Sequence, residues 1–152
     1  MKLKKKKSTI LKNRIINIFM KNGNKRTSEK NLLKASKSLQ KVSNKNFRNI
    51  IQLSIINTTS AFKLNEQVMK KGKRKSKKVT PSFIIQDSLR VMTALKFMKG
   101  VVRKNKSSAN FHESLANEML ASFSLKSQSI EQKARLQTQI LVNKRYLSKF
   151  KW

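Results

Sequence analysis

Residues suited to acid–base or metal chemistry are few and scattered in this sequence of 152 residues. The carboxylates lack the i+3 or i+4 spacing that places two side chains on one helical face; they are Glu29, Glu66, Asp87, Glu113, Glu118 and Glu131. His112 is the one histidine and cysteine is absent, so no set of metal ligands can be assembled. The three glycines are isolated, which excludes a glycine-rich phosphate loop. We therefore expect no enzyme, no metal and no cofactor, with His112 at the surface or the edge of a core.

Positive charge is the chemical feature that this sequence has in abundance. It contains 37 Lys and Arg against 6 Asp and Glu, a formal net charge of +31, and the cations occur from Lys2 to Lys151. A compact domain with this charge repels itself unless a polyanion neutralises it. RNA and DNA do so while releasing condensed counterions, whereas solubility alone needs a much smaller net charge. We therefore expect a nucleic-acid-binding protein.

An anionic membrane is the other polyanion that such a chain could meet. No apolar run approaches the ~20 residues that span a bilayer, and polar breaks argue against a single amphipathic helix. Residues 1–8 contain a lysine run but lack the apolar segment and cleavage site of a secretory signal, and they lack the Arg and Ser bias of a mitochondrial presequence. We therefore expect no membrane insertion.

The aromatic residues divide into two groups. Five phenylalanines fall on apolar helical faces and are most simply core residues: Phe19, Phe47, Phe97, Phe111 and Phe123. Tyr146, Phe150 and Trp152 lie instead among cations near the C-terminus. Rings interleaved with cations suit single-stranded RNA, where the ring covers a base or sugar and the cation meets a phosphate. A tail folded back onto the core is the equal alternative.

The elements that position these residues are mostly helical. Few glycines and one proline favour long helices, and apolar residues recur with helical spacing at about 10–20, 27–42, 47–55, 89–102, 111–123 and 130–147. The expected caps are Asn22-Gly23 after the first helix, Thr27 or Ser28 before the second, Asn44 or Asn46 before the third, and Ser107 or Ser108 before the fifth.

The apolar positions also predict which helical faces are buried. The third helix has the clearest pattern, at Phe47, Ile50, Ile51, Ser54 and Ile55. The second helix is expected to bury Leu32, Ala35, Leu39 and Val42. The last helix carries two neighbouring stripes, one of Ile130, Ala134 and Leu141 and the other of Leu136, Ile140 and Leu147.

Between residues 61 and 83 the helical period gives way to alternation. Phe62, Leu64, Glu66 and Val68 occupy every second position, and apolar character resumes around Pro81. Residues 70–78 between these arms contain seven Lys or Arg, which cannot pack into an apolar core. This pattern predicts a β-ribbon with a basic tip; a disordered solvated loop is the alternative for the isolated protein.

The expected fold class is therefore mainly α, a six-helix bundle-like domain with a β-ribbon arm inserted between the third and fourth helices. With 38% hydrophobic residues the chain can bury one modest core. We expect residues 1–9 to form a basic N-terminal tail and residues 10–152 a single domain, with the arm at about 61–83.

Three stretches, in order along the chain, resemble the small-subunit ribosomal protein seven family. Residues 15–29, Ile-Ile-Asn-Ile-Phe-Met-Lys-Asn-Gly-Asn-Lys-Arg-Thr-Ser-Glu, are similar to the family signature, in which an apolar stretch ending in Met precedes Gly, basic residues and a helix start. Residues 115–120 resemble its Leu-Ala-Asn-Glu-Leu segment, and residues 143–152 its C-terminal Asn-Lys…Tyr-Arg-Trp ending. The resemblance covers the chain from about residue 10 to the end.

The chain departs from this family at three points. Thr59-Ser60 stands where the family has Arg-Pro, the lysine-rich tip replaces Gly-Gly, and Phe97 takes the place of a Trp. Such divergence is typical of mitochondrially encoded members, and Lys, Asn and Ile, which are abundant here, have A/T-rich codons. We therefore expect a mitochondrial ribosome in the matrix, with a chloroplast or the bacterial cytoplasm as the alternative location.

The resemblance implies a structural constituent of the small ribosomal subunit, which binds the 3′ major domain of small-subunit rRNA and helps to assemble the head. It implies neighbouring head ribosomal proteins as partners, and a ribbon near exit-site tRNA and mRNA. We expect the RNA-binding residues to be Lys4, Lys5, Lys6, Lys7, Lys25, Arg26, Lys70, Lys71, Lys73, Arg74, Lys75, Lys77, Lys78, Arg90, Lys144, Arg145, Lys149, Lys151 and Trp152. The alternative function is a non-specific DNA-compacting, histone-like protein, which would bind any duplex with comparable affinity.

Overall fold

The structure, a computed structural model, describes residues 2–43, 46–71, 74–104 and 110–144. In this part of the chain the elements are α1 (Lys2–Phe19), α2 (Lys25–Val42), α3 (Phe47–Thr58), β1 (Phe62–Lys71), β2 (Arg74–Phe83), α4 (Asp87–Lys104), α5 (Phe111–Phe123) and α6 (Gln128–Val142). The predicted fold class is confirmed, because the described residues form six helices with one two-stranded antiparallel ribbon between α3 and α4.

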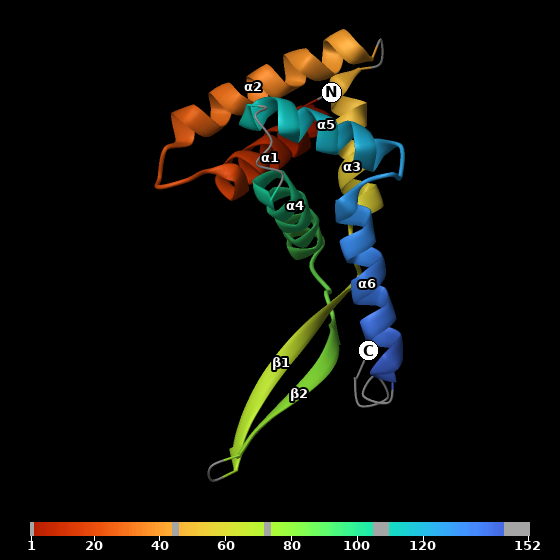
Figure 1. The fold of residues 1–152 in the computed structure, drawn as a ribbon. Coiled ribbons are helices and arrows are strands. Elements are labelled where there is room, and N and C mark those ends of the chain that lie inside the picture. Colours follow the sequence, from red (N-terminus) through yellow and green to blue (C-terminus); the bar gives the residue numbers. More distant parts are fainter. Residues whose placement is uncertain (1, 44–45, 72–73, 105–109, 145–152) are drawn as a thin grey trace.

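One apolar core holds the helical body together. The helices contribute aliphatic side chains with no exposed surface, among them Ile16 of α1, Leu39 of α2 and Leu95 of α4. Each such side chain stabilises the fold by about 1.5–3 kcal/mol relative to leaving it in water. Phe19 of α1 meets Phe111 of α5 edge-on, with ring centroids 6.0 Å apart. α5 lies across α2 and α3 in the centre of the body (Figure 1).

The turn between α1 and α2 is built on Asn22 and Gly23. Their φ angles are 50° and 75°, in the left-handed region that asparagine and glycine tolerate best, so the predicted end of the first helix is confirmed. α2 then follows directly on its N-cap, Asn24, three or four residues before the predicted cap. Ser28 does not cap α2 because its buried hydroxyl donates to the carbonyl of Ile16 in α1, at 3.0 Å. This bond ties the two helices together.

One further helix start and one further cap differ from prediction, and one cap agrees. The backbone of α1 is helical from Lys2 rather than from about residue 10, so the lysine run continues the first helix. Asn110 is the N-cap of α5. The cap predicted for α3 is confirmed at Asn46, whose side chain accepts a backbone N–H two residues further on at 3.4 Å. Three other predicted caps lie outside the described residues: Asn44, Ser107 and Ser108.

The predicted apolar face is confirmed on α3 and is wrong at the ends of α2 and α6. On α3 the buried residues include Ile50, Ile51, Ser54 and Ile55. By contrast Val42, Ala134 and Leu141 are exposed, and Leu147 lies outside the described residues. α6 extends beyond the body beside β1, so along most of its length neighbouring elements cover only some of its sides (Figure 1). Only its Ser129 and Ile140 are buried among the residues described.

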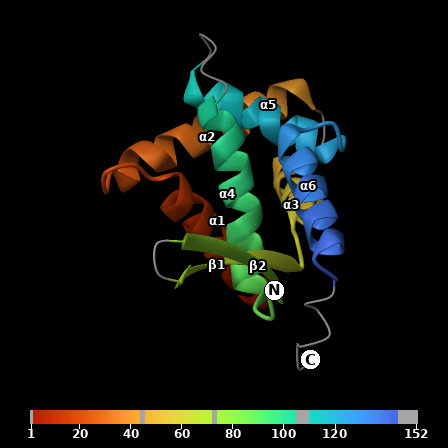
Figure 2. The ribbon, with the colours of Figure 1, turned by 60° about the horizontal axis from the view of Figure 1, so that its bottom comes forward.

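The ribbon has one continuous antiparallel register. It runs from Phe62 opposite Phe83 at the base to the pair 71–74 at the far end, and the alternation seen in the sequence places Leu64 opposite Pro81. The rings of Phe62 and Phe83 lie edge-on with centroids 5.5 Å apart. Pro81 is tolerated because each strand of a two-stranded ribbon is an edge. The ribbon projects from the body, and Figure 2 views it with its far end brought forward.

Candidate nucleic-acid interface

The distal half of the ribbon carries a dense cluster of cations. Residues 70–78 contain seven Lys or Arg and no carboxylate. The register places Lys70 opposite Lys75 and Lys71 opposite Arg74. Like charges directly opposite each other on neighbouring strands destabilise a ribbon. A polyanion lying along these strands would relieve the repulsion, because its phosphates neutralise Lys and Arg.

Arg90 joins the base of the ribbon to α4. Its Nε donates to the carbonyl of Ile84 at 2.7 Å, and its guanidinium lies 4.9 Å from the centre of the Phe83 ring. A cation over an aromatic face at a partly exposed site contributes about 0.5–1 kcal/mol. Asp87 lies 3.8 Å from the same guanidinium. Arg90, which we predicted to bind RNA, therefore has a structural role at the ribbon base, and an RNA contact of Arg90 stays a prediction.

A second cationic surface lies at the turn between α1 and α2. Lys25 and Arg26 are exposed there, in the first turn of α2. That turn carries no acidic residue, and Asn24 makes no side-chain cap, so nothing in it neutralises the positive end of the helix dipole. Beside it is a hollow of about 240 Å³ whose lining includes the polar residues Lys21, Asn22, Asn24, Thr27 and Asn31. Cations and helix N–H groups together suit a phosphate.

Sequence reasoning singled out Lys25 and Arg26 at this turn but not Lys21 or Asn31. Those two residues line the hollow together with side chains from both ends of the turn. Lys21 lies within residues 15–29, the stretch that resembles the family signature, and that position could have identified it as a candidate RNA-binding residue. For Asn31 the only comparable indication in the sequence is its position two residues beyond that stretch.

Two lysines outside the predicted set are used inside the body. Lys99 of α4 donates from Nζ to the carbonyl of Ile18 near the end of α1, and Lys133 of α6 donates to the carbonyl of Asn57 near the end of α3, at 2.7 Å. Helix C-termini leave carbonyls unpaired and carry partial negative charge, so a cation there is stabilising. For Lys99 the cost of burying the charge exceeds this attraction, because burial lowers its pKa and the nearby Arg103 lowers it further. Some of the positive charge therefore serves the fold.

Buried polar side chains also serve helix ends. Glu118, only 7% exposed, accepts hydrogen bonds from the hydroxyl and, at 3.3 Å, the backbone N–H of Ser129 at the start of α6. The helix dipole favours a carboxylate at this position. Asn57 donates from Nδ2 to the carbonyl of Ser122 near the end of α5, at 3.0 Å. Glu118 is thus a structural residue at the corner between α5 and α6.

Groups that could carry other chemistry are not assembled in the described part of the chain. No three His, Cys, Asp or Glu residues among those described come together as metal ligands. His112 has an 18% exposed side chain 3.8 Å from Glu113, which places it at the edge of the body. None of the described helices combines the length and the apolar character needed to cross a bilayer.

The remaining predicted RNA-binding residues are placed in part. Lys77 and Lys144 are exposed and Lys78 is half-buried. The backbone alone places eight others, which are Lys4, Lys5, Lys6 and Lys7 in α1 and Lys70, Lys71, Arg74 and Lys75 in the ribbon. Outside the described residues lie Lys73, Arg145, Lys149, Lys151 and Trp152, together with Tyr146 and Phe150. The turn after α1 and the tip of the ribbon lie at different ends of the molecule, so the predicted residues do not form one site (Figure 1).

Comparison with protein families adds evidence that the geometry alone does not give. Residues 1–144 match the model of a family described as ribosomal protein S7p/S5e. The matched range contains every helix and both strands of the described part of the chain. A comparison with curated proteins finds no similar sequence.

Proposed function

We propose, from the premise that the chain belongs to the ribosomal protein S7p/S5e family, that it binds the 3′ major domain of small-subunit rRNA and helps to assemble the head of the subunit. Membership makes the chain a ribosomal protein of the small subunit, with rRNA and other ribosomal proteins as its partners. The family is one of structural ribosomal proteins and not of enzymes.

The observation that carries the proposal is the cationic distal half of the ribbon. Its register sets Lys70 against Lys75 and Lys71 against Arg74, an arrangement that is unfavourable in the free protein. RNA phosphates along both strands would convert this repulsion into attraction. The apolar base of the ribbon and Arg90 hold the arm on the body, so the arm can extend into RNA without unfolding.

The mechanism of binding is electrostatic and geometric. A-form RNA hides the base edges of its major groove, so duplex rRNA is recognised by shape, phosphates and 2′-hydroxyls. Cations at the turn after α1 and at the ribbon would meet separate RNA segments, since these two surfaces lie apart in the fold (Figure 1). A rigid body that binds several segments holds rRNA helices in a fixed arrangement, which is the work of an assembly protein.

We assign different tasks to the body and the arm. Lys25, Arg26, Lys144 and Arg145 bind rRNA and secure incorporation into the subunit. The ribbon tip adds rRNA phosphate contacts that incorporation does not require, and it reaches toward exit-site tRNA and the mRNA path. The projection of the ribbon away from the body supports this division (Figure 1).

We assign the protein to a mitochondrial ribosome in the matrix. The support is compositional, because Lys, Asn and Ile, with A/T-rich codons, are frequent throughout the sequence. Chloroplast and bacterial ribosomes are the alternatives. Cosedimentation with small subunits from fractionated organelles tests the assignment.

The proposed function is tested by gradient sedimentation of the full chain with small ribosomal subunits at moderate salt. The wild-type protein should sediment with the subunit, and in competition a folded 3′ major domain fragment should displace it far better than duplex DNA of equal length. Equal competition by DNA would instead support the non-specific DNA-compacting alternative.

Two variants then separate the body from the arm. Replacing Lys71, Lys73, Arg74, Lys75 and Lys77 with Ser should leave incorporation largely intact and reduce retention of exit-site tRNA. Replacing Lys25, Arg26, Lys144 and Arg145 with Ser should weaken incorporation itself. The division is wrong if the first variant fails to enter the subunit while the second enters normally.

A further inference from the structure

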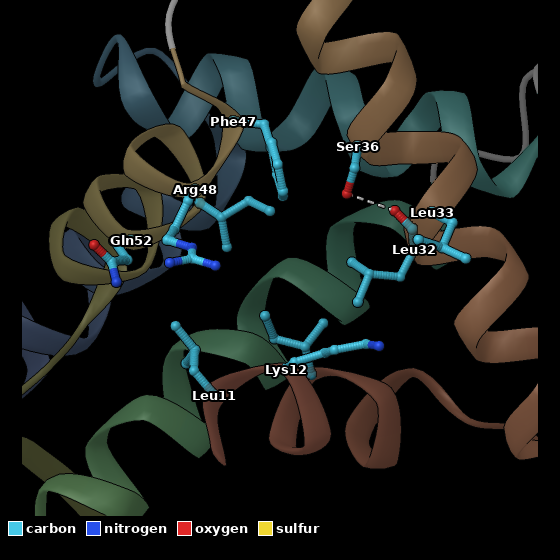
Figure 3. A pocket seen from close by; sticks show the side chains of 10 residues that line it. Leu11, Lys12, Leu32, Leu33, Ser36, Phe47, Arg48 and Gln52 are labelled. Carbon is cyan, nitrogen blue, oxygen red and sulfur yellow. Dashed lines mark hydrogen bonds between the residues drawn. The ribbon is translucent and has the colours of Figure 1, made fainter. Parts of the chain in front are cut away.

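An apolar groove of about 310 Å³ lies where α1, α2 and α3 pack incompletely against one another. Its floor is formed by Ile15, Leu32 and Ile51, one residue from each helix, which are 3%, 8% and 7% exposed. Leu33 stands at the rim and is 57% exposed. Figure 3 shows Phe47 at one side of the opening, with its ring directed into the groove.

The charged residues of the lining are cations. Lys12 of α1 and Arg48 of α3 are both exposed and line the groove, and none of the residues that line it is acidic. Ser36 cannot offer its proton to an occupant, because its hydroxyl donates to the carbonyl of Leu32 at 2.8 Å. Gln52 adds a neutral amide to the lining, so recognition of charge at this groove falls to the two cations, which favour an anionic group next to an apolar one.

The chemistry of the floor distinguishes a protein occupant from RNA. RNA bases stack on aromatic rings or guanidinium planes, which Phe47 and Arg48 offer at the sides of this groove, but its floor is formed by three aliphatic side chains, on which a base does not stack. A ribose–phosphate backbone laid over them would leave the floor without apolar partners. Aliphatic or aromatic side chains would instead remove the floor and Leu33 from water. The volume is at the lower end of the ~300–1,000 Å³ typical of ligand pockets, which suits a few side chains and not a folded domain.

We infer that this groove binds a short segment of another protein, in which two or three large apolar side chains alternate with carboxylates. The apolar side chains lie over Ile15, Leu32 and Ile51, and the carboxylates meet Lys12 and Arg48. The inference concerns a protein contact and does not depend on which rRNA domain the cationic surfaces bind.

A defined peptide tests this inference with the full-length protein. The probe is a short fluorescent helical peptide with Leu at i, i+3 and i+4 and with Glu at the positions that flank this stripe, since helices enter apolar grooves by anchors at such a spacing. Binding is followed by anisotropy at about 0.3 M salt, where exposed charges more than a few ångströms apart are screened. A peptide with every Leu replaced by Ser keeps the charge, and it should bind at least about tenfold more weakly, because burial of two or three side chains is lost.

Leu33→Gln is the informative substitution, and Leu53→Gln is its matched control. Both leucines are exposed, 57% and 44%, but Leu53 does not line the groove. Leu33→Gln should weaken binding of the Leu/Glu peptide about fivefold to tenfold, while Leu53→Gln should change it less than about twofold. Circular dichroism should show both variants folded, because neither side chain is buried. Equal effects of the two substitutions would overturn the inference.

The two cations are tested by Lys12→Gln combined with Arg48→Gln. This variant should lose affinity for the Leu/Glu peptide and keep its affinity for a Leu/Gln peptide. Equal losses for both peptides would show that Lys12 and Arg48 do not bind the carboxylates, and this would overturn that part of the inference.

The assembled particle provides an independent readout. A photo-crosslinking residue at Gln52, which is exposed at the groove, should attach to a protein segment containing apolar and acidic residues, and Leu33→Gln should reduce the yield. Attachment to rRNA with the same sensitivity to Leu33→Gln would overturn the inference in favour of an RNA occupant.

Discussion

Lysine and arginine have opposite roles in the helical body and in the ribbon arm. In the body, Lys99 and Lys133 turn inward to the carbonyl ends of neighbouring helices, and Arg90 holds the ribbon base. In the distal ribbon, Lys71 stands opposite Arg74, with no carboxylate anywhere in residues 70–78. The hydrogen bonds of Lys99 and Lys133 therefore tie helices of the body together, whereas the facing cations of the arm repel one another, and we expect a polyanion to relieve that repulsion.

This difference shows why net charge is a poor guide to a binding surface in a very basic protein. Lysine is so frequent here that two lysines, Lys99 and Lys133, serve as hydrogen-bond donors to helix ends. What separates the two roles is the neighbour, a carbonyl in one region and another cation in the other. The predictions below test that separation, from the largest expected effect to the smallest.

The salt dependence of RNA binding should distinguish arm from body most strongly. With about eight to ten phosphates contacted, log K for a 3′ major domain fragment should fall with log salt at a slope of roughly −6 to −9. The five-Ser tip variant removes up to five contacts, so the magnitude of its slope should be smaller by up to about 3.5–4.5. Replacing Lys99 and Lys133 with Gln should change the slope by less than about 1, because these side chains are occupied. Fluorescence titrations at several salt concentrations measure all three slopes. Equal slopes for the two variants would contradict the difference in role between the cations of the arm and the two lysines of the body.

Carboxylates should show the same contrast in stability. Glu118→Ala leaves the buried N–H and hydroxyl of Ser129 without their acceptor, so we expect a loss of about 1–3 kcal/mol in the free energy of unfolding. Glu66 is exposed on β1, and Glu66→Ala should stay within about 0.5 kcal/mol of the wild type. Urea denaturation followed by circular dichroism gives both values. A larger loss at Glu66 would mean that the ribbon contributes more to the fold than its exposure indicates.

Removing a helix-capping lysine should have a smaller effect. Lys133→Met keeps an apolar stem of similar length but leaves the carbonyl of Asn57 without its donor, and we expect about 1 kcal/mol of destabilisation. Lys63→Met on the exposed face of β1 is the control and should be near neutral. If both variants are equally stable, the hydrogen bond from Lys133 contributes nothing measurable.

The smallest expected effect is the pH dependence contributed by Lys99. Its pKa is lowered in the folded chain, by burial first and by Arg103 second, from an ordinary value of 10.5. Between the folded and the unfolded pKa the unfolded chain binds more protons, so stability should rise with pH in that window. Lys99→Gln should lose this rise. Comparing the urea midpoints of both proteins from neutral pH to about 10 measures the difference; parallel curves would show that Lys99 does not contribute.

The sequence allowed much of the fold to be predicted because the responsible signals are local. Apolar spacing defined α3, alternation defined the ribbon, and positive φ at Asn22 and Gly23 followed from their residue types. The start of α2 was placed too late because Ser28 satisfies a carbonyl of another helix, a partner twelve positions away that local capping rules do not consider. On α6 the predicted Ile140 is buried, but Ala134 and Leu141 are exposed because that helix leaves the body, and periodicity alone does not show where a neighbour ends.

Of the candidate site, only the cations that cluster in the sequence could be predicted. Seven cations in nine residues identify the ribbon tip without a structure. The inward roles of Lys99 and Lys133 depend on partners 81 and 76 residues away, so no sequence window contains them. The groove between α1, α2 and α3 results from imperfect packing of three helices whose individual apolar faces look ordinary, and only the assembled body reveals it.

The two capping lysines are synthesised long after the carbonyls to which they donate. Lys99 follows Ile18 by 81 residues, and Lys133 follows Asn57 by 76 residues. At a translation rate of ~5–20 residues per second, each delay lasts roughly 4–16 s. During that time these two carbonyls lack their lysine donors. The ends of α1 and α3 therefore receive these donors from the second half of the nascent chain.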